Sequence, residues 1–345
     1  MSTEYEEKKT WKHTKRHLKR THRRFLNLIE KRIEELGPDD ENRRRFEALC
    51  GKLPMEGPLR QSDMIANFYL AKYVAKEVRA LKRVSEDLDF YFLTLLADEG
   101  IMSDRKPRFA RRLLARKADK AMRMAGLDGF FTVEAQAVTN WPQEGRGRAL
   151  LGHVHILGWK DQDAPNNSAA DIRRELGHGK RRQNRAWSCR LGAEPIHVLH
   201  ITEDLGCPSY WAAYLMKMPH TAKRLGRQQD KESATLRTPD IRLRNAKKYR
   251  PELGMRLFEM LAQMPLTAAV GGVGTGATML TRCRNRLKLR DERRLARWKR
   301  KGVEWVPVFK ERKFWKRTHK RRRARYRPFF IDGPTVARRT TRRRL

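Results

Sequence analysis

The chain has 345 residues, of which 79 are Lys or Arg and 40 are Asp or Glu, so its formal net charge is +39. This excess of positive charge predicts a polyanionic partner, most simply nucleic acid. The sequence has no apolar run of about 20 residues and its charged N-terminus is unlike a signal peptide, which argues against a membrane protein and favours a cytoplasmic one. The four cysteines form no Cys-x-x-Cys pair, which disfavours a zinc ribbon.

The first part of the chain is predicted to be helical and basic. Residues 1–48 carry a broken stripe of apolar side chains at helical spacing on a Lys/Arg background, with a turn at 37–40. Ser62 and Asp63 can cap a second long helix that runs to about Arg83.

The middle of the chain is predicted to build a sheet. Residues 89–97 are rich in aromatic residues and favour a first strand, and a basic amphipathic helix at 107–124 follows it. Residues 130–138 alternate apolar and polar side chains, as a half-buried strand does. A hairpin-type loop at 140–148 then leads into the apolar run 150–159, so these two strands are predicted to be antiparallel neighbours.

The second half of the chain mixes one further strand with helices and basic loops. A strand is predicted at 195–202, and Pro208 suits the first turn of a helix that Pro219 closes. The remaining expectations are a loop-like basic stretch with short helices at 222–250, an apolar-striped helix at 252–263, a flexible glycine loop at 271–276 and a basic helix at 291–301.

Two histidines, His153 and His155, flank a single valine inside the apolar run. Residues two apart in a strand point to the same face, so both imidazoles would stand side by side and could hold one divalent metal ion. Glu134 lies mid-strand among apolar neighbours, where an unpaired carboxylate would be costly. A metal ion would explain it, a salt bridge to an arginine is the alternative, and Glu144 in the loop is a second candidate ligand.

A tyrosine-rich segment follows the strand at 195–202. Tyr210, Tyr214 and Lys217 have the spacing of residues that share one helix face. A tyrosine hydroxyl can act as a covalent nucleophile, a metal ion can polarise a phosphodiester, and a nearby lysine adds positive charge. This combination suits transesterification of a nucleic-acid backbone.

These motifs resemble those of the HUH endonuclease superfamily. His153-Val154-His155 is similar to its His-hydrophobe-His motif, Tyr214-Leu215-Met216-Lys217 to the Tyr-x-x-Lys motif of rolling-circle replication initiators, and Phe92-Leu93-Thr94-Leu95 to their first strand motif. The resemblance covers about residues 88–225. Tyr210 together with Tyr214 is similar to the two-tyrosine pattern of gene A-type phage initiators.

The resemblance implies an α+β fold in which a central antiparallel sheet with flanking helices forms a ferredoxin-like palm, here with basic helical extensions at both ends. It implies nicking of single-stranded DNA at a replication origin by Tyr214, with Tyr210 as a possible second nucleophile and Lys217 beside them. Mg²⁺ or Mn²⁺ would be held by His153, His155 and Glu134. The expected partners are origin DNA and a helicase and polymerase of a bacterial or archaeal host cell.

The chain departs from the two-tyrosine pattern at Ala213, where those initiators carry a lysine. The full double pattern stands instead at Tyr69–Lys76, where Tyr69 and Tyr73 are each followed by a lysine three residues later. That segment precedes the histidines, as the tyrosine does in conjugative relaxases. The simpler interpretation is that both tyrosines pack a helix against the core.

Four segments are expected: a basic helical region at 1–86, the catalytic domain at 87–225, a helical accessory region at 226–309 and an Arg/Lys-rich DNA-binding tail at 310–345. The leading hypothesis is a nickase that initiates rolling-circle replication of a plasmid, phage or integrated element. A conjugative relaxase or single-strand transposase would use the same chemistry. A non-catalytic nucleic-acid-binding protein with a structural His-x-His pair is the competing class.

Overall fold

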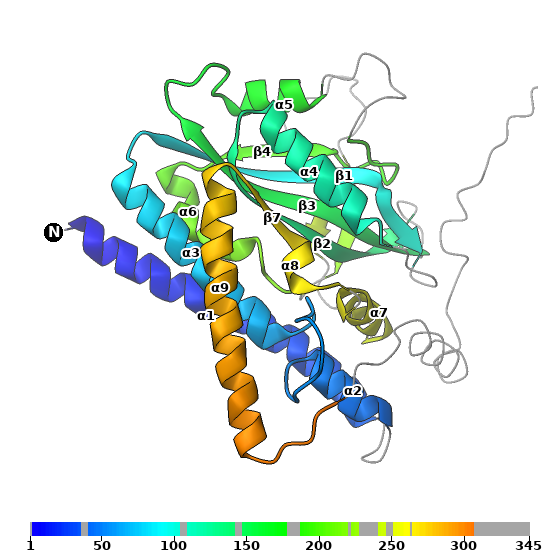
Figure 1. Ribbon diagram of the computed structural model, residues 1–345. Coiled ribbons are helices and arrows are strands. Elements are labelled where there is room, and N and C mark those ends of the chain that lie inside the picture. Colours follow the sequence, from blue (N-terminus) through cyan, green and yellow to red (C-terminus); the bar gives the residue numbers. More distant parts are fainter. Residues whose placement is uncertain are drawn as a thin grey trace, which may run out of the picture.

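The structure is a computed structural model that describes residues 2–35, 41–103, 109–141, 147–177, 187–219, 222–227, 241–245, 251–262 and 264–306 (Figure 1). The N-terminal helices are α1 (Ser2–Glu34), α2 (Glu41–Leu49) and α3 (Met64–Val84). The central elements are β1 (Leu88–Ser103), α4 (Arg111–Met124), β2 (Asp128–Trp141), β3 (Gly147–Asp161), α5 (Ala169–Gly177), β4 (Ile196–His200), the short 3-10 helix η2 (Glu203–Leu205) and α6 (Pro208–Tyr214). The last elements are β5 (Lys223–Arg227), β6 (Ile241–Asn245), α7 (Pro251–Ala262), α8 (Leu266–Ala269), β7 (Val270–Val273) and α9 (Thr275–Arg300).

One mostly antiparallel sheet forms the centre of the molecule. Its strands follow the order β4-β1-β3-β2-β5-β6, and β7 pairs with β2 beside this path. The long strands β1, β3 and β2 pair antiparallel, whereas β2 and β5 pair in parallel. The expected central antiparallel sheet with flanking helices, an α+β arrangement, is therefore confirmed.

The two faces of the sheet are covered by different helices (Figure 1). On one face, Leu93, Val133 and Val154 pack under α4 and α5 in a fully apolar core. On the other face, Phe92 and Leu157 pack against α3, α6 and α9. Because side chains alternate along each strand, Thr132, Glu134 and Gln136 of β2 and His153 and His155 of β3 point toward this second group of helices.

Helix α3 begins where the sequence predicted it. The Asp63 carboxylate accepts a hydrogen bond from the Ala66 backbone N–H at 2.9 Å and thereby caps the helix. Arg294 from α9 pairs with the same carboxylate at 2.7 Å. The cap therefore also fixes α9 against the N-terminal end of α3.

Three expectations for the second half of the chain were wrong. The stretch 222–250, expected to be loop-like with short helices, contains the strands β5 and β6, and Leu225 pairs directly with Leu243. The glycines at 271–276 form β7 and the start of α9 rather than a flexible loop, and α9 begins at Thr275 instead of near 291. A Cβ on Gly276 would lie 2.1 Å from the Gly129 carbonyl oxygen, so this glycine allows α9 to approach β2 closely.

The tyrosine helix is also shorter than expected. Helix α6 ends at Tyr214, so Lys217 lies beyond it in a tight turn. Pro219 has no N–H to continue the helical ladder, and its ring disfavours a helical conformation at Met218. Across the described part of the chain, no helix combines the length and the apolar character that crossing a bilayer requires.

Candidate metal centre and active site

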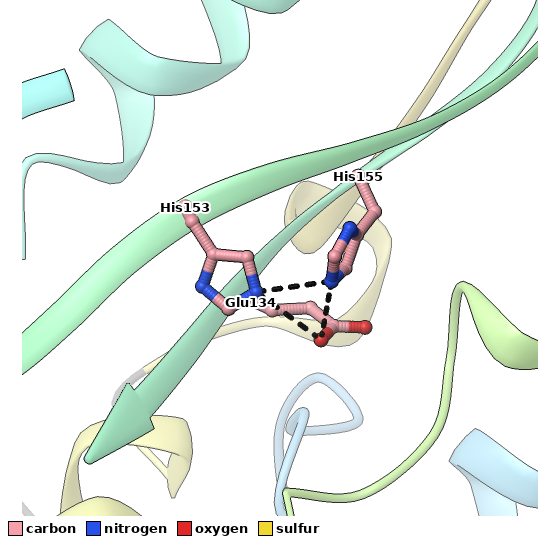
Figure 2. A group of neighbouring side chains, drawn as sticks. All are labelled: Glu134, His153 and His155. Carbon is pink, nitrogen blue, oxygen red and sulfur yellow. Dashed lines mark hydrogen bonds and ion pairs between the residues drawn. The ribbon is translucent and has the colours of Figure 1, made fainter. Parts of the chain in front are cut away.

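The β2–β3 hairpin brings together Glu134, His153 and His155, which we call the ligand cluster (Figure 2). Glu134 lies directly opposite His153 in the antiparallel register, and Thr132 lies opposite His155. Directly paired residues of neighbouring strands point to the same face. The expected ligand Glu134 and both expected histidines therefore meet on the face covered by α3 and α6.

The separations within the ligand cluster suit one divalent ion. The two histidine Nε2 atoms are 3.0 Å apart, and Glu134 Oε2 lies 3.8 Å from His153 Nε2 and 3.7 Å from His155 Nε2. A circle through these three atoms has a radius of about 2.0 Å, which is the usual distance from a divalent metal ion to imidazole or carboxylate ligands. One ion could therefore bind all three atoms without moving them apart.

Hydrogen bonds from outside the ligand cluster orient both imidazole rings. His153 Nδ1 donates to the Leu151 carbonyl oxygen at 3.4 Å, which leaves its Nε2 lone pair facing the cluster. His155 Nδ1 lies 3.0 Å from the Thr94 hydroxyl, which can accept its proton. Hydrogen bonds from Nδ1 to groups outside the cluster are typical of metal-binding histidines. Without a metal ion, His155 Nε2 can donate to His153 Nε2 across the 3.0 Å between them.

Burial controls the protonation of the ligand cluster. It lowers the pKa of His153 to about 3, with Lys217 adding to the effect, and it lowers the pKa of His155 well below the ordinary value. Both rings are therefore neutral and able to bind metal at neutral pH. Burial also raises the pKa of Glu134 to about 7, although Lys217 and Lys223 oppose the rise. One oxygen of this carboxylate, Oε1, has no hydrogen-bond partner among the described residues.

Tyr214 and Lys217 lie against the ligand cluster. The Tyr214 ring centroid is 6.1 Å from that of His155, and Phe92 from β1 contacts both rings. Lys217 Nζ lies 3.5 Å from the Tyr214 ring centroid and 3.7 Å from Glu134 Oε2. Although Lys217 is not on the helix, its side chain lies beside Tyr214, as the spacing of the two residues in the sequence predicted.

Tyr210 occupies a different position from Tyr214. Its ring is 6.3 Å from the Tyr214 ring and packs against His13 and His17 of α1, at 6.2 and 5.8 Å. Burial raises the pKa of Tyr210, and the proximity of Tyr214 adds to this. Tyr210 therefore contacts the ligand cluster only through its neighbour.

The alternative candidates lie elsewhere. Tyr69 and Tyr73 are half-buried on α3 and pack against each other, with the Arg290 guanidinium 3.2 Å over the Tyr69 ring. Glu144 lies outside the described residues.

Sequence reasoning missed several residues of the site. Lys223 on β5 lies close enough to Lys217 and Glu134 to interact electrostatically, and burial lowers its pKa to about 8. Burial lowers the pKa of His17 on α1, and the positive charge of Lys217 lowers it further. Neither residue stands in a recognisable motif, because both reach the site through tertiary packing of segments distant in sequence. A small pocket beside Glu134, lined in part by Gln61 and Asn67, completes the polar surroundings.

Helix packing, sheet register and side-chain chemistry thus converge on one buried group, Glu134, His153 and His155, that could hold a divalent metal ion beside a tyrosine and a lysine. Comparison with protein-family models, with curated proteins and with solved structures gave no match for this chain.

Proposed function

We propose that the protein is a metal-dependent nickase of single-stranded DNA, with Tyr214 as the nucleophile and the ligand cluster as the site of Mg²⁺ or Mn²⁺. The observation that carries the proposal is the position of Lys217 Nζ, 3.5 Å from the Tyr214 ring centroid and 3.7 Å from Glu134. A nucleophile, a cation and three metal ligands thus lie around one point. The central antiparallel sheet is compatible with the palm of the HUH superfamily.

The reaction follows from the residues around this point. The Tyr214 hydroxyl loses its proton and its oxygen attacks the scissile phosphorus, so a 5′-phosphotyrosine bond forms while the bond to the 3′-oxygen breaks. The released 3′-oxygen takes up a proton and becomes a free 3′-hydroxyl. Lys217 can donate a hydrogen bond to a phosphate oxygen as charge develops there. Glu134, His153 and His155 would hold the divalent ion, which would supply Lewis-acid polarisation of the phosphate.

A free 3′-hydroxyl is a primer, which connects this chemistry to rolling-circle replication of a plasmid, phage or integrated element. The substrate would be single-stranded DNA at an origin, with host helicase and polymerase acting after the nick. A conjugative relaxase or a single-strand transposase would use the same residues, and the DNA around the nick distinguishes these roles. The order of motifs along the chain, histidine strand before tyrosine helix, is that of replication initiators.

The test is formation of a covalent protein–DNA adduct. The full-length protein is incubated with Mn²⁺ and 3′-end-labelled single strands that tile the DNA around its coding sequence, then separated in denaturant. We expect a labelled adduct from the wild-type protein and from Tyr73→Phe, a matched loss of a hydroxyl on α3, but none from Tyr214→Phe. Tyr214→Phe should still bind the same strands. An adduct that survives Tyr214→Phe, or is lost in Tyr73→Phe, would contradict the assignment, and a wild-type protein that binds DNA without forming any adduct would favour the non-catalytic class.

A further inference from the structure

A cluster of cations lies on three helices that are distant in sequence. Lys15 and Lys19 lie on α1, Lys72 and Lys76 on α3, and Arg290 on α9; we call these five residues the basic platform. Helix α3 packs against both α1 and α9, on the side of the sheet that carries α6 (Figure 1). Lys72 Nζ and the Arg290 guanidinium both lie over the Tyr69 ring, 5.9 and 3.2 Å from its centroid. Partial burial lowers the pKa of Lys72, and the positive charges of the other four cations lower it further.

The basic platform differs from three other cations of α9. Arg282 and Arg286 share the Glu77 carboxylate, and Arg294 pairs with Asp63 and Asp291, so these three cations have carboxylate partners within the protein. Among the described residues, Lys19, Lys76 and Arg290 have no carboxylate partner. Like charges that are gathered without counter-charges repel one another, which destabilises the folded state unless a polyanion binds them.

The aromatic rings beside the basic platform are covered, which favours binding of a nucleic-acid backbone over binding of exposed bases. Single-strand grooves use exposed aromatic rings on which bases stack. Here Arg290 covers the face of the Tyr69 ring and Tyr73 is half-buried against the core, so neither ring is open for stacking. Helix α1 has 33 residues and is about 50 Å long, which exceeds one turn of duplex DNA at about 34 Å.

Helix α1 also connects the basic platform to the candidate active site. His17, Arg20 and Arg24 lie on a second stripe of α1, and Lys217 is close enough to influence the pKa of His17, which burial lowers. His17 in turn packs against Tyr210. A nucleic acid lying along α1 would therefore reach from the basic platform toward Tyr214.

We propose that the basic platform binds the phosphate backbone of double-stranded DNA next to the single-stranded segment that enters the site at Tyr214. The location of the single strand rests on the proposed function, whereas duplex binding by these cations does not require the nicking reaction.

The test compares two variants that each lose three exposed charges. The first, Lys19→Gln with Lys76→Gln and Arg290→Gln, removes one platform cation from each helix. The second, Arg112→Gln with Arg116→Gln and Lys120→Gln, removes three exposed cations of α4, on the opposite face of the sheet. The whole chain carries +39, so absolute affinity is uninformative and the difference between these matched variants is what decides.

Binding of a labelled 30-base-pair duplex by the full chain is measured in EDTA at several salt concentrations. The platform variant should reduce the slope of log affinity against log salt by about 3 and weaken binding about a hundredfold near 0.1 M salt, whereas the α4 variant should change little. Equal losses in both variants, or an unchanged slope in the platform variant, would overturn the inference. The inference would also be overturned if the platform variant lost affinity for a single strand of the same sequence but kept its affinity for the duplex.

Folding of both variants is checked by thermal melting. Should the triple platform variant unfold, Lys76→Gln alone gives the same comparison, with an expected slope change of about 1. Because EDTA removes any metal-dependent cleavage, the two proposals fail separately. If the platform variant loses duplex binding and the wild-type protein forms no adduct, the basic platform is retained and the nickase is rejected. If the wild-type protein forms the adduct and the platform variant keeps its duplex binding, the nickase is retained and the basic platform is rejected.

Discussion

Replacement of Glu134 by glutamine is expected to stabilise the metal-free protein at alkaline pH. Burial raises the pKa of this carboxyl from 4.5 to about 7, so the folded state binds more protons than the unfolded state between these values. The wild-type protein therefore loses stability as the pH rises through this window, and glutamine, which resembles the neutral acid, does not. The difference corresponds to about 3 kcal/mol at pH 8 and less than half of that at pH 5.5.

Guanidinium denaturation of wild type and Glu134→Gln in EDTA measures this difference, and the comparison of pH 5.5 with pH 8 serves as an internal control. Mn²⁺ at a thousand times its dissociation constant should reverse the order, because glutamine is a poorer ligand and the wild-type protein then gains about 4.1 kcal/mol. A variant that is less stable than wild type at pH 8 in EDTA would refute the reasoning. It would show that Lys217 and Lys223 stabilise the carboxylate more than burial destabilises it.

Three further substitutions test single features of the structure. Tyr210→Phe should retain adduct formation in the denaturing gel assay, because the Tyr210 ring packs on the α1 histidines rather than on the ligand cluster. Asp63→Ala should lower the free energy of unfolding by about 2–4 kcal/mol in chemical denaturation, because it removes a helix cap and one of the two carboxylates that pair with Arg294, the other being Asp291. Gly276→Ala should cost about 1–3 kcal/mol and lower the melting temperature, because the new Cβ would meet the Gly129 carbonyl oxygen at 2.1 Å.

The sequence could predict those parts of the site that depend on local periodicity. Alternation along β2 and β3 is enough to place both histidines and Glu134 on one face, because two antiparallel neighbours keep their side chains in step. The start of α3 could be predicted for the same reason, since the Asp63 cap is a contact within four residues. The strands β1 and β4 followed from their composition.

The parts that could not be predicted depend on contacts between distant segments. Strand β5 joins the sheet through a single parallel pair, Val138 with Lys223. Its basic sequence lacks the alternation of apolar and polar residues that would have predicted a strand. The glycines of β7 and of the start of α9 suggest flexibility in sequence, but a Cβ on Gly271 of β7 would collide with the Phe131 ring, and one on Gly276 of α9 would collide with the Gly129 carbonyl oxygen, so close packing explains their presence. The role of α1 beside Tyr210 carries no local signal at all.

The register of the β2–β3 hairpin has a consequence for how the protein matures. The three candidate metal ligands lie within 22 consecutive residues, so a hairpin that forms early in folding can assemble them before the rest of the chain is in place. Tyr214 arrives only when α6 docks onto Phe92, a contact across more than a hundred residues. Under the proposed function, metal binding would then precede the docking of Tyr214, and damage that loosens α6 would leave a protein that can still bind an ion but cannot attack DNA.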